Sequence, residues 1–247
     1  MINLIGAIAC IAISLIWYMP GVRLQGDQKV LQKGDYLKVA FLYGLLISCL
    51  LIIITEITWD IIFWKPGSEG LAKNVLSDFF RAALLEEAFK FLGIFLAVRA
   101  LNPQRKIDFM MIAGMIGLMY GIVEKVAMAN AAGMVVGVLL PMHLLWQLNQ
   151  GGHYFEYKKA RLLNDQSKAG KELFMMLAVP YIYHGCWDSA IDIGAELLNK
   201  HSTAPQVIGG VLIVGIIVLS IVYMVRTIKK MRNTARNSDR LPDPGQA

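Results

Sequence analysis

The amino-acid sequence predicts an all-α, polytopic membrane protein with about seven transmembrane helices. Of its 247 residues, 56% are hydrophobic and only 17% are charged, whereas ordinary soluble domains carry about 25% charged residues. The mean hydropathy of +0.53 excludes disordered and coiled-coil chains. A helix needs roughly 20 apolar residues to cross the bilayer core. The stretches that approach this length lie at residues 3–19, 37–57, 76–101, 108–128, 131–149, 171–198 and 206–227.

Lys and Arg residues are concentrated in alternate loops. The loops after the first, third and fifth predicted spans, with the C-terminal segment, hold 18 of them, whereas the N-terminus holds none and the remaining loops hold four. Because cytoplasmic loops carry the excess of Lys and Arg, the N-terminus is predicted outside and the C-terminus in the cytoplasm. The net charge of +6 therefore lies at the membrane surface and does not indicate a nucleic-acid partner. His153 falls in the basic loop after the fifth span, where we expect it to be solvated.

Ionisable side chains also lie inside four of the predicted spans. They are Glu86, Glu87 and Lys90 in the third span, Glu124 in the fourth, His143 in the fifth, and His184 and Asp188 in the sixth. A charge at the bilayer centre costs at least about 2.5–3.5 kcal/mol, so such residues indicate a functional site. At the helical rise of about 1.5 Å per residue, these groups fall at similar depths. We expect one polar cavity that opens toward the outer half of the membrane.

The spacing of these residues predicts contacts within two of the helices. Lys90 follows Glu86 by four residues and Glu87 by three, so its ammonium can offset part of their charge. Asp188 follows His184 by four residues. Together with Glu124, the two adjacent glutamates should titrate as a coupled set, because three carboxylates in one desolvated cavity cannot all ionise at low cost. A carboxylate that accepts a proton near neutral pH suits a general base for water.

The order of these motifs resembles a known family. Glu86-Glu87-Ala-Phe-Lys90 matches a Glu-Glu-x-x-Lys motif, and Tyr120-Gly-Ile-Val-Glu124 matches an aromatic-x-x-x-Glu motif. His143 and the His184–Asp188 segment follow on later helices. Over about residues 76–190, the chain resembles the PrsW-type intramembrane glutamic proteases, distant relatives of the CAAX-prenyl-protease-like membrane proteins. Tyr120 stands where that motif more often has Phe, and Asp188 corresponds to an Asn or Asp position of the wider superfamily.

The resemblance implies hydrolysis of a peptide bond without a metal or another cofactor. Its implied catalytic residues are Glu86, Glu87, Glu124 and His184, with Lys90, His143, Asp188 and Tyr120 in support. Glu86 would activate water, Glu124 would help to hold that water, and Glu87 would be the second acidic group. Neighbouring residues on a helix point about 100° apart, so the choice of base between Glu86 and Glu87 stays open.

The supporting residues take their roles from the same resemblance. Lys90 would set the charge state of the two glutamates, and His143 would orient water or substrate. His184 with Asp188 would stabilise the oxyanion of the tetrahedral intermediate. The implied substrate is a single-pass membrane protein, such as an anti-sigma factor, cut near the outer side of a bacterial cytoplasmic membrane.

The predicted organisation is simple. We expect a single transmembrane helical domain over residues 1–228, with its catalytic core at about residues 76–198. Residues 229–247 are expected to form a basic, flexible cytoplasmic tail. The partners implied are the lipid bilayer, in which the chain is multi-pass, and the membrane-protein substrate.

Two other classes of function stay open. Three carboxylates and two histidines also supply donors for a zinc-dependent membrane hydrolase that acts on a lipid or an amide. Against this class, the sequence has no His-Glu-x-x-His spacing. A transporter or proton relay is the non-enzymatic alternative, because intramembrane Glu, His and Lys residues also mark ion pathways. Transporters often have pseudo-symmetric halves, for which the sequence gives no sign.

Overall fold

The computed structural model describes residues 35, 38–51, 53–54, 70, 75–128, 141–237 and 239–242. This part of the chain is helical, with one isolated bridge between Arg105 and Arg240, in agreement with the predicted all-α class. The helices are η1 (Val39–Leu45), η2 (Asp78–Ala83), α5 (Leu84–Leu101), α6 (Lys106–Met128), α8 (Met142–Leu162), α9 (Gln166–Leu198) and α10 (Thr203–Asn237).

Two described helices are long and apolar enough to cross a membrane, namely Lys106–Glu124 and Thr203–Asn237. Helix Leu42–Leu51 is apolar but shorter. Helices η2 and α5 cover the predicted span at 76–101, and α9 covers the one at 171–198. The predicted span at 3–19 and the first ten residues of the span at 131–149 lie outside the described residues.

The fifth span was predicted to end at residue 149, but the helix that contains its last residues does not end there. Helix α8 continues to Leu162, so most of the predicted basic loop is helical. Burial explains the difference, because Tyr154, Phe155 and Ala160 pack into the protein core and a helix in contact with protein does not need apolar residues all round. His153 is not a solvated loop residue, since its Nδ1 lies 2.7 Å from Glu172 Oε2.

The segment predicted to be a flexible tail, residues 229–247, is helical in its first part. Residues 229–237 continue helix α10, where Met231 and Thr234 are buried. Beyond this helix, the amide of Lys106 donates to the Asp239 carbonyl at 2.9 Å, and the amide of Leu241 donates to the Gln104 carbonyl at 2.9 Å. These bonds hold residues 239–241 against the loop between α5 and α6.

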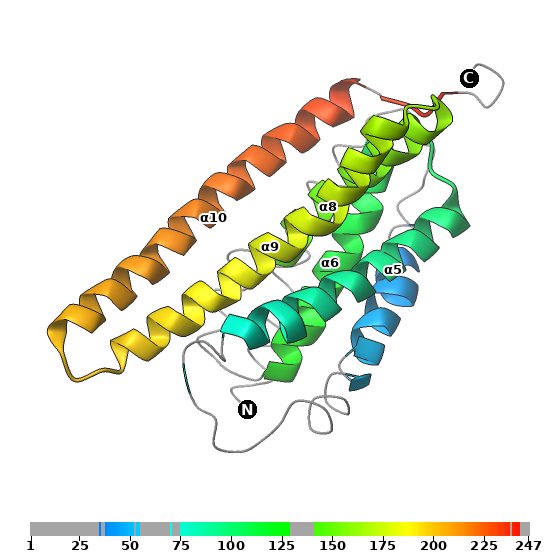
Figure 1. Cartoon of the computed structure of the whole chain (residues 1–247). Helices are drawn as coiled ribbons and strands as arrows, with labels where there is room; N and C mark the ends of the chain where they lie inside the picture. Colours follow the sequence, from blue (N-terminus) through cyan, green and yellow to red (C-terminus); the bar gives the residue numbers. More distant parts are fainter. Residues whose placement is uncertain are drawn as a thin grey trace.

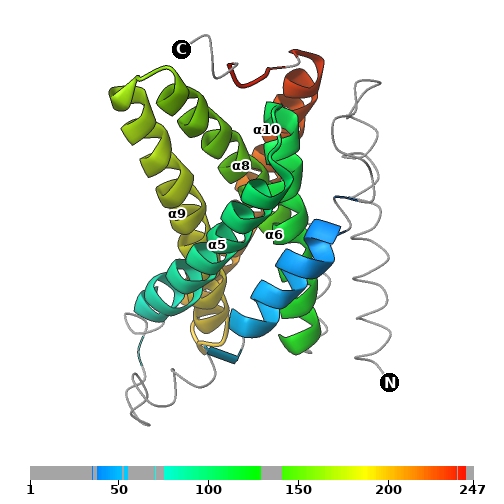
Figure 2. The ribbon, with the colours of Figure 1, turned by 90° about the vertical axis from the view of Figure 1, so that its right-hand side faces the viewer.

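Helices α6 and α8 pack closely because glycines face the contact. A Cβ atom on Gly117 would lie 2.3 Å from the His143 carbonyl oxygen, and one on Gly151 would lie 2.3 Å from the Phe109 carbonyl oxygen. Larger side chains at these positions would push the two helices apart. Figures 1 and 2 show α6 between α5, α8 and η1, with α9 and α10 running side by side in opposite directions.

One end of the bundle gathers three of the four segments that were predicted to be cytoplasmic, and the fourth, the loop after the first span, lies almost wholly outside the described residues. The α5–α6 loop, the turn after α8 and the C-terminal end of α10 lie together there (Figure 1). Glu156 on α8 joins two neighbouring helices at this end, with Oε1 2.5 Å from Lys106 Nζ and Oε2 3.1 Å from Lys168 Nζ. The Asp165 side chain begins α9 by accepting the Lys168 amide at 2.9 Å.

Candidate active site

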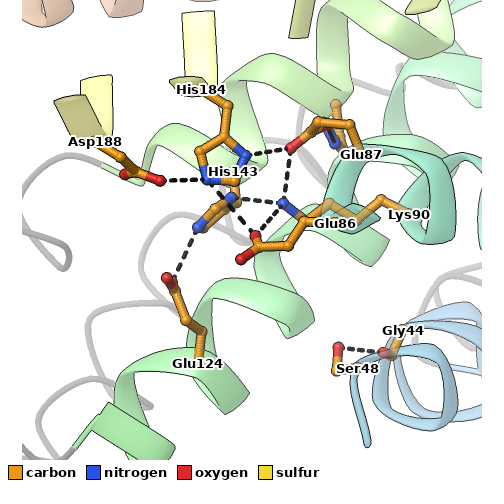
Figure 3. Close-up of polar contacts among 10 residues, drawn as sticks. Gly44, Ser48, Glu86, Glu87, Lys90, Glu124, His143, His184 and Asp188 are labelled. Atoms are coloured by element: carbon orange, nitrogen blue, oxygen red, sulfur yellow. Dashed lines mark hydrogen bonds and ion pairs between the residues drawn. The ribbon is translucent and has the colours of Figure 1, made fainter. Parts of the chain in front are cut away.

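The ionisable residues of four helices meet around the ammonium group of Lys90 (Figure 3). Lys90 Nζ lies 2.8 Å from Glu87 Oε1, 3.1 Å from Glu86 Oε2 and 2.9 Å from His143 Nδ1. The Lys90 side chain is 0% exposed. Its Nζ also lies 4.0 Å from the centre of the Tyr120 ring, a cation–π contact. The intrahelical spacing of α5 thus produces the two ion pairs that it predicted.

Glu87 is held by three donors. Its Oε1 also lies 2.8 Å from His184 Nδ1, and its Oε2 accepts from Gln147 Nε2 at 2.5 Å. Both oxygens are therefore engaged in a side chain that is only 4% exposed. This arrangement suits a carboxylate that stays ionised and holds other groups in place.

Glu86 has a different set of partners from Glu87. Its Oε2 lies 3.1 Å from Lys90 Nζ and 3.6 Å from His184 Nε2. The Tyr120 hydroxyl is a further hydrogen-bond partner of its carboxylate. The side chain is 11% exposed. The structure thus gives the two adjacent glutamates different surroundings, a difference that spacing along the helix does not predict.

His143 links Lys90 to Glu124. An ammonium group can only donate hydrogen bonds, so His143 Nδ1 is the acceptor from Lys90. The proton of a neutral His143 ring is then on Nε2, which lies 3.0 Å from Glu124 Oε2 and donates to it. The contact joins the start of α8 to the C-terminal part of α6, where Gly121 leaves space for the His143 ring.

His184 lies between carboxylates. Its Nδ1 faces Glu87, and its Nε2 lies 3.1 Å from Asp188 Oδ2. Because carboxylates accept hydrogen bonds, both contacts are satisfied by a ring that is protonated on both nitrogens. The His184 side chain is 2% exposed and that of Asp188 is 31% exposed, so Asp188 lies at the edge of the cluster.

Two neighbouring residues of α8 complete the site, and both were missed by the sequence analysis. The Trp146 ring stacks on His184, with centroids 4.9 Å apart and an interplanar angle of 29°, and meets the His143 ring edge-on at 5.3 Å. Gln147 contacts Glu87 as described above. The signal that could have found them is their position three and four residues after His143, which places them on the same helix face.

All eight residues predicted for the site belong to this one cluster. They are Glu86, Glu87, Lys90, Tyr120, Glu124, His143, His184 and Asp188. Tyr120 joins it through Lys90 and through an edge-on contact with the His143 ring at 5.2 Å. The cluster residues lie near the N-terminal ends of α5 and α8, near the C-terminal end of α6 and just past the middle of α9.

The cluster also contains the donor atoms of a metal site. Glu86, His143 and His184 each offer one atom within 4.8 Å of the others, and catalytic zinc commonly has three nitrogen or oxygen ligands from the protein. In this arrangement the same donor atoms have protein partners. Both nitrogens of each ring already have partners, and the Lys90 ammonium contacts two of the three candidate ligands. A divalent cation would require Lys90 to move or to lose its proton.

The comparison with protein families gives a match over most of the chain. The model described as "PrsW family intramembrane metalloprotease" matches residues 33–225, which include the whole cluster around Lys90. Comparisons with curated proteins and with solved structures gave no significant match. The match supports the resemblance seen in the motifs. It also supports the expectation that the chain is a membrane protease. This chain belongs to the PrsW family of intramembrane proteases.

Proposed function

We propose that this chain is a metal-independent, glutamic-type endopeptidase that cleaves a single-pass membrane protein, such as an anti-sigma factor. The family match supports an intramembrane protease. The observation that carries the glutamic mechanism is the contrast between Glu87, bound at both oxygens and 4% exposed, and Glu86, which is 11% exposed and has Lys90 and Tyr120 as partners. The position of the Lys90 ammonium among the candidate metal ligands supports metal independence.

In the proposed mechanism, Glu86 is the general base. It takes a proton from a water molecule while the water oxygen attacks the carbonyl carbon of the scissile peptide bond. The protonated Glu86 then donates to the nitrogen of the leaving amine, and the C–N bond breaks. Lys90 compensates the charge of the ionised carboxylates through its contacts with Glu86 and Glu87.

Glu124 and His143 form the opposite side of the proposed water site. His143 Nε2 donates to Glu124 Oε2 at 3.0 Å and so fixes the direction of this carboxylate. The Glu124 side chain is 13% exposed, slightly more than that of Glu86. Glu124 is therefore proposed to hold the attacking water, and His143 to orient Glu124.

His184 is proposed to stabilise the oxyanion that forms on the substrate carbonyl. A ring protonated on both nitrogens places positive charge beside the negative oxygen in a site that largely excludes water. Glu87 and Asp188 hold this ring from its two nitrogens. At 31%, Asp188 is the most exposed of the five site residues on α5 and α9, so we propose that the substrate approaches from its side.

Cleavage near the outer side of the membrane is supported by the position of the cluster. Along α8, His143 comes thirteen residues before Glu156, and along α9, His184 comes sixteen residues after Lys168, so the cluster lies away from the basic segments. If these basic segments face the cytoplasm, as the distribution of Lys and Arg predicts, the cluster faces the outer leaflet.

The test compares native membranes that hold the wild type with membranes that hold Glu86→Gln, Glu87→Gln or Glu124→Gln. New protein termini are mapped by mass spectrometry with and without a chelator. The proposal expects particular membrane-protein termini to vanish in the Glu86→Gln and Glu124→Gln membranes and to persist when the chelator is added to the wild type.

Two results would count against the proposal. Loss of the same termini with the chelator would indicate a zinc hydrolase. An unchanged set of termini, with all four proteins folded and present in equal amounts, would remove support for a protease and favour a transporter or proton relay.

A further inference from the structure

A proline interrupts the hydrogen bonds of helix α9 one turn before His184. Pro180 lies inside the helix and has no backbone N–H, so it cannot donate to the carbonyl of Met176 four residues earlier. Met176 and Pro180 are both buried. The Met176 carbonyl therefore needs a donor from elsewhere, because an unpaired backbone oxygen is costly in a buried position.

Gln150 of α8 supplies this donor. Its Nε2 donates to the Met176 carbonyl oxygen at 3.1 Å, and Gln150 is 0% exposed. A carbonyl oxygen only accepts, so the amide group of Gln150 must face it through the nitrogen. The side chain thus replaces the bond that Pro180 removes.

The position of Gln150 connects this bond to the active site. On α8, Gln150 lies one helical turn after Trp146 and Gln147, which contact His184 and Glu87. On α9, the bonded carbonyl lies two turns before His184, with Pro180 between them. One face of α8 therefore holds α9 at two points, the Met176 carbonyl and the His184 ring.

We propose that Gln150 is a positioning residue for His184. By closing the gap that Pro180 leaves in α9, it fixes the direction of the helix segment that carries His184 and keeps the ring stacked on Trp146. The catalytic consequence rests on the proposed function, whereas the positioning itself does not.

The test is a double-mutant cycle between Gln150 and Pro180 in the full-length protein. Gln150→Met keeps the length of the side chain but removes the donor. Pro180→Ala restores a backbone N–H that can bond the Met176 carbonyl, so Gln150 is no longer required. The readout is hydrogen exchange of the backbone amides of residues 177–188, measured by mass spectrometry in detergent micelles.

We expect Gln150→Met to raise the equilibrium constant for local opening of this segment by about fivefold to about 150-fold, the range expected for one unpaired buried carbonyl. In the Pro180→Ala background the same substitution should change exchange by less than about twofold. An equal effect in both backgrounds, or no effect in either, would overturn the proposal.

Asn149→Leu is the matched control. Asn149 is a buried amide beside Gln150, but its Nδ2 donates to Tyr223 and Thr227 of α10. Its effect on the same amides should be equal with and without Pro180. A coupling of Asn149 to Pro180 as large as that of Gln150 would show a general loosening of α8 and would refute a specific role for Gln150.

Cleavage gives the second readout, once the membrane comparison has supplied a substrate. Gln150→Met should lower kcat with little change in KM, and Pro180→Ala should remove most of this difference. Hydrogen exchange can show the coupling between Gln150 and Pro180 while neither the wild type nor any variant cleaves a substrate. In that case the positioning of α9 stands and the proposed protease function fails. If cleavage occurs but exchange shows no coupling, the positioning inference alone fails.

Discussion

Replacing Lys90 by methionine removes the cation from the centre of a buried charge cluster. The side chains of Lys90, Glu87 and Glu86 are 0%, 4% and 11% exposed. With contact distances of 2.8 Å to Glu87 and 3.1 Å to Glu86, the attractions are about 6 and about 5 kcal/mol at an effective dielectric constant of about 20. The cost of burying the charges offsets part of this sum. Breaking a buried ion pair costs about 3–5 kcal/mol, and we expect Lys90→Met to lower the free energy of unfolding by that amount.

The assay is equilibrium unfolding in mixed detergent micelles, followed by the loss of helical circular dichroism. The double variant Lys90→Met/Glu87→Gln is the control, because it removes one buried negative charge together with the positive charge. It should be more stable than Lys90→Met alone. The reasoning is refuted if Lys90→Met lowers the free energy of unfolding by less than about 1 kcal/mol, the value for an exposed pair, or if the double variant is no more stable than the single one.

Two further predictions concern the packing of α8. Burial acts to raise the pKa of Glu156, but hydrogen bonds from its two lysine partners outweigh burial and hold the pKa below its usual value of 4.5. The stability that Glu156 contributes is therefore complete above pH 4.5 and is lost as the pH falls through the lowered pKa. The difference in stability between the wild type and Glu156→Gln should shrink on acidification, and a constant difference would contradict this prediction. Gly117→Ala should cost about 1–3 kcal/mol, because its methyl group meets the His143 carbonyl oxygen. Gly210→Ala, which meets no atom within 4 Å, should be neutral or stabilising in the same unfolding assay, and equal effects of the two substitutions would refute the packing argument.

Contacts within one helix were the part of the site that the sequence predicted best. The spacing of Glu86, Glu87 and Lys90 predicts their ion pairs, and the spacing of His184 and Asp188 predicts the bond between them. These predictions succeed because residues three and four apart share a helix face whatever the neighbouring helices do.

Contacts between helices depend on packing and were predicted only as a shared polar layer. The different surroundings of Glu86 and Glu87 arise because Gln147 reaches only Glu87. The sequence does not show which residue a side-chain amide in an apolar stretch will contact, so Gln147 and Gln150 were missed. The extension of α8 beyond residue 149 was missed for a related reason, since hydropathy measures contact with lipid, whereas Tyr154, Phe155 and Ala160 pack on protein.

The central claim is that Glu86, and not a bound metal, activates the water. The measurement that tests it most directly uses the purified protein in proteoliposomes with a substrate found in the membrane comparison. Cleavage by the wild type is followed before and after removal of metals with a chelator, with the metal content determined on the same samples, and is compared with cleavage by Glu86→Gln. The account predicts that the metal-depleted wild type keeps its rate and that Glu86→Gln loses at least about 100-fold, the lower range for a general base. Loss of the wild-type rate on metal removal, with recovery when zinc is returned, would contradict it.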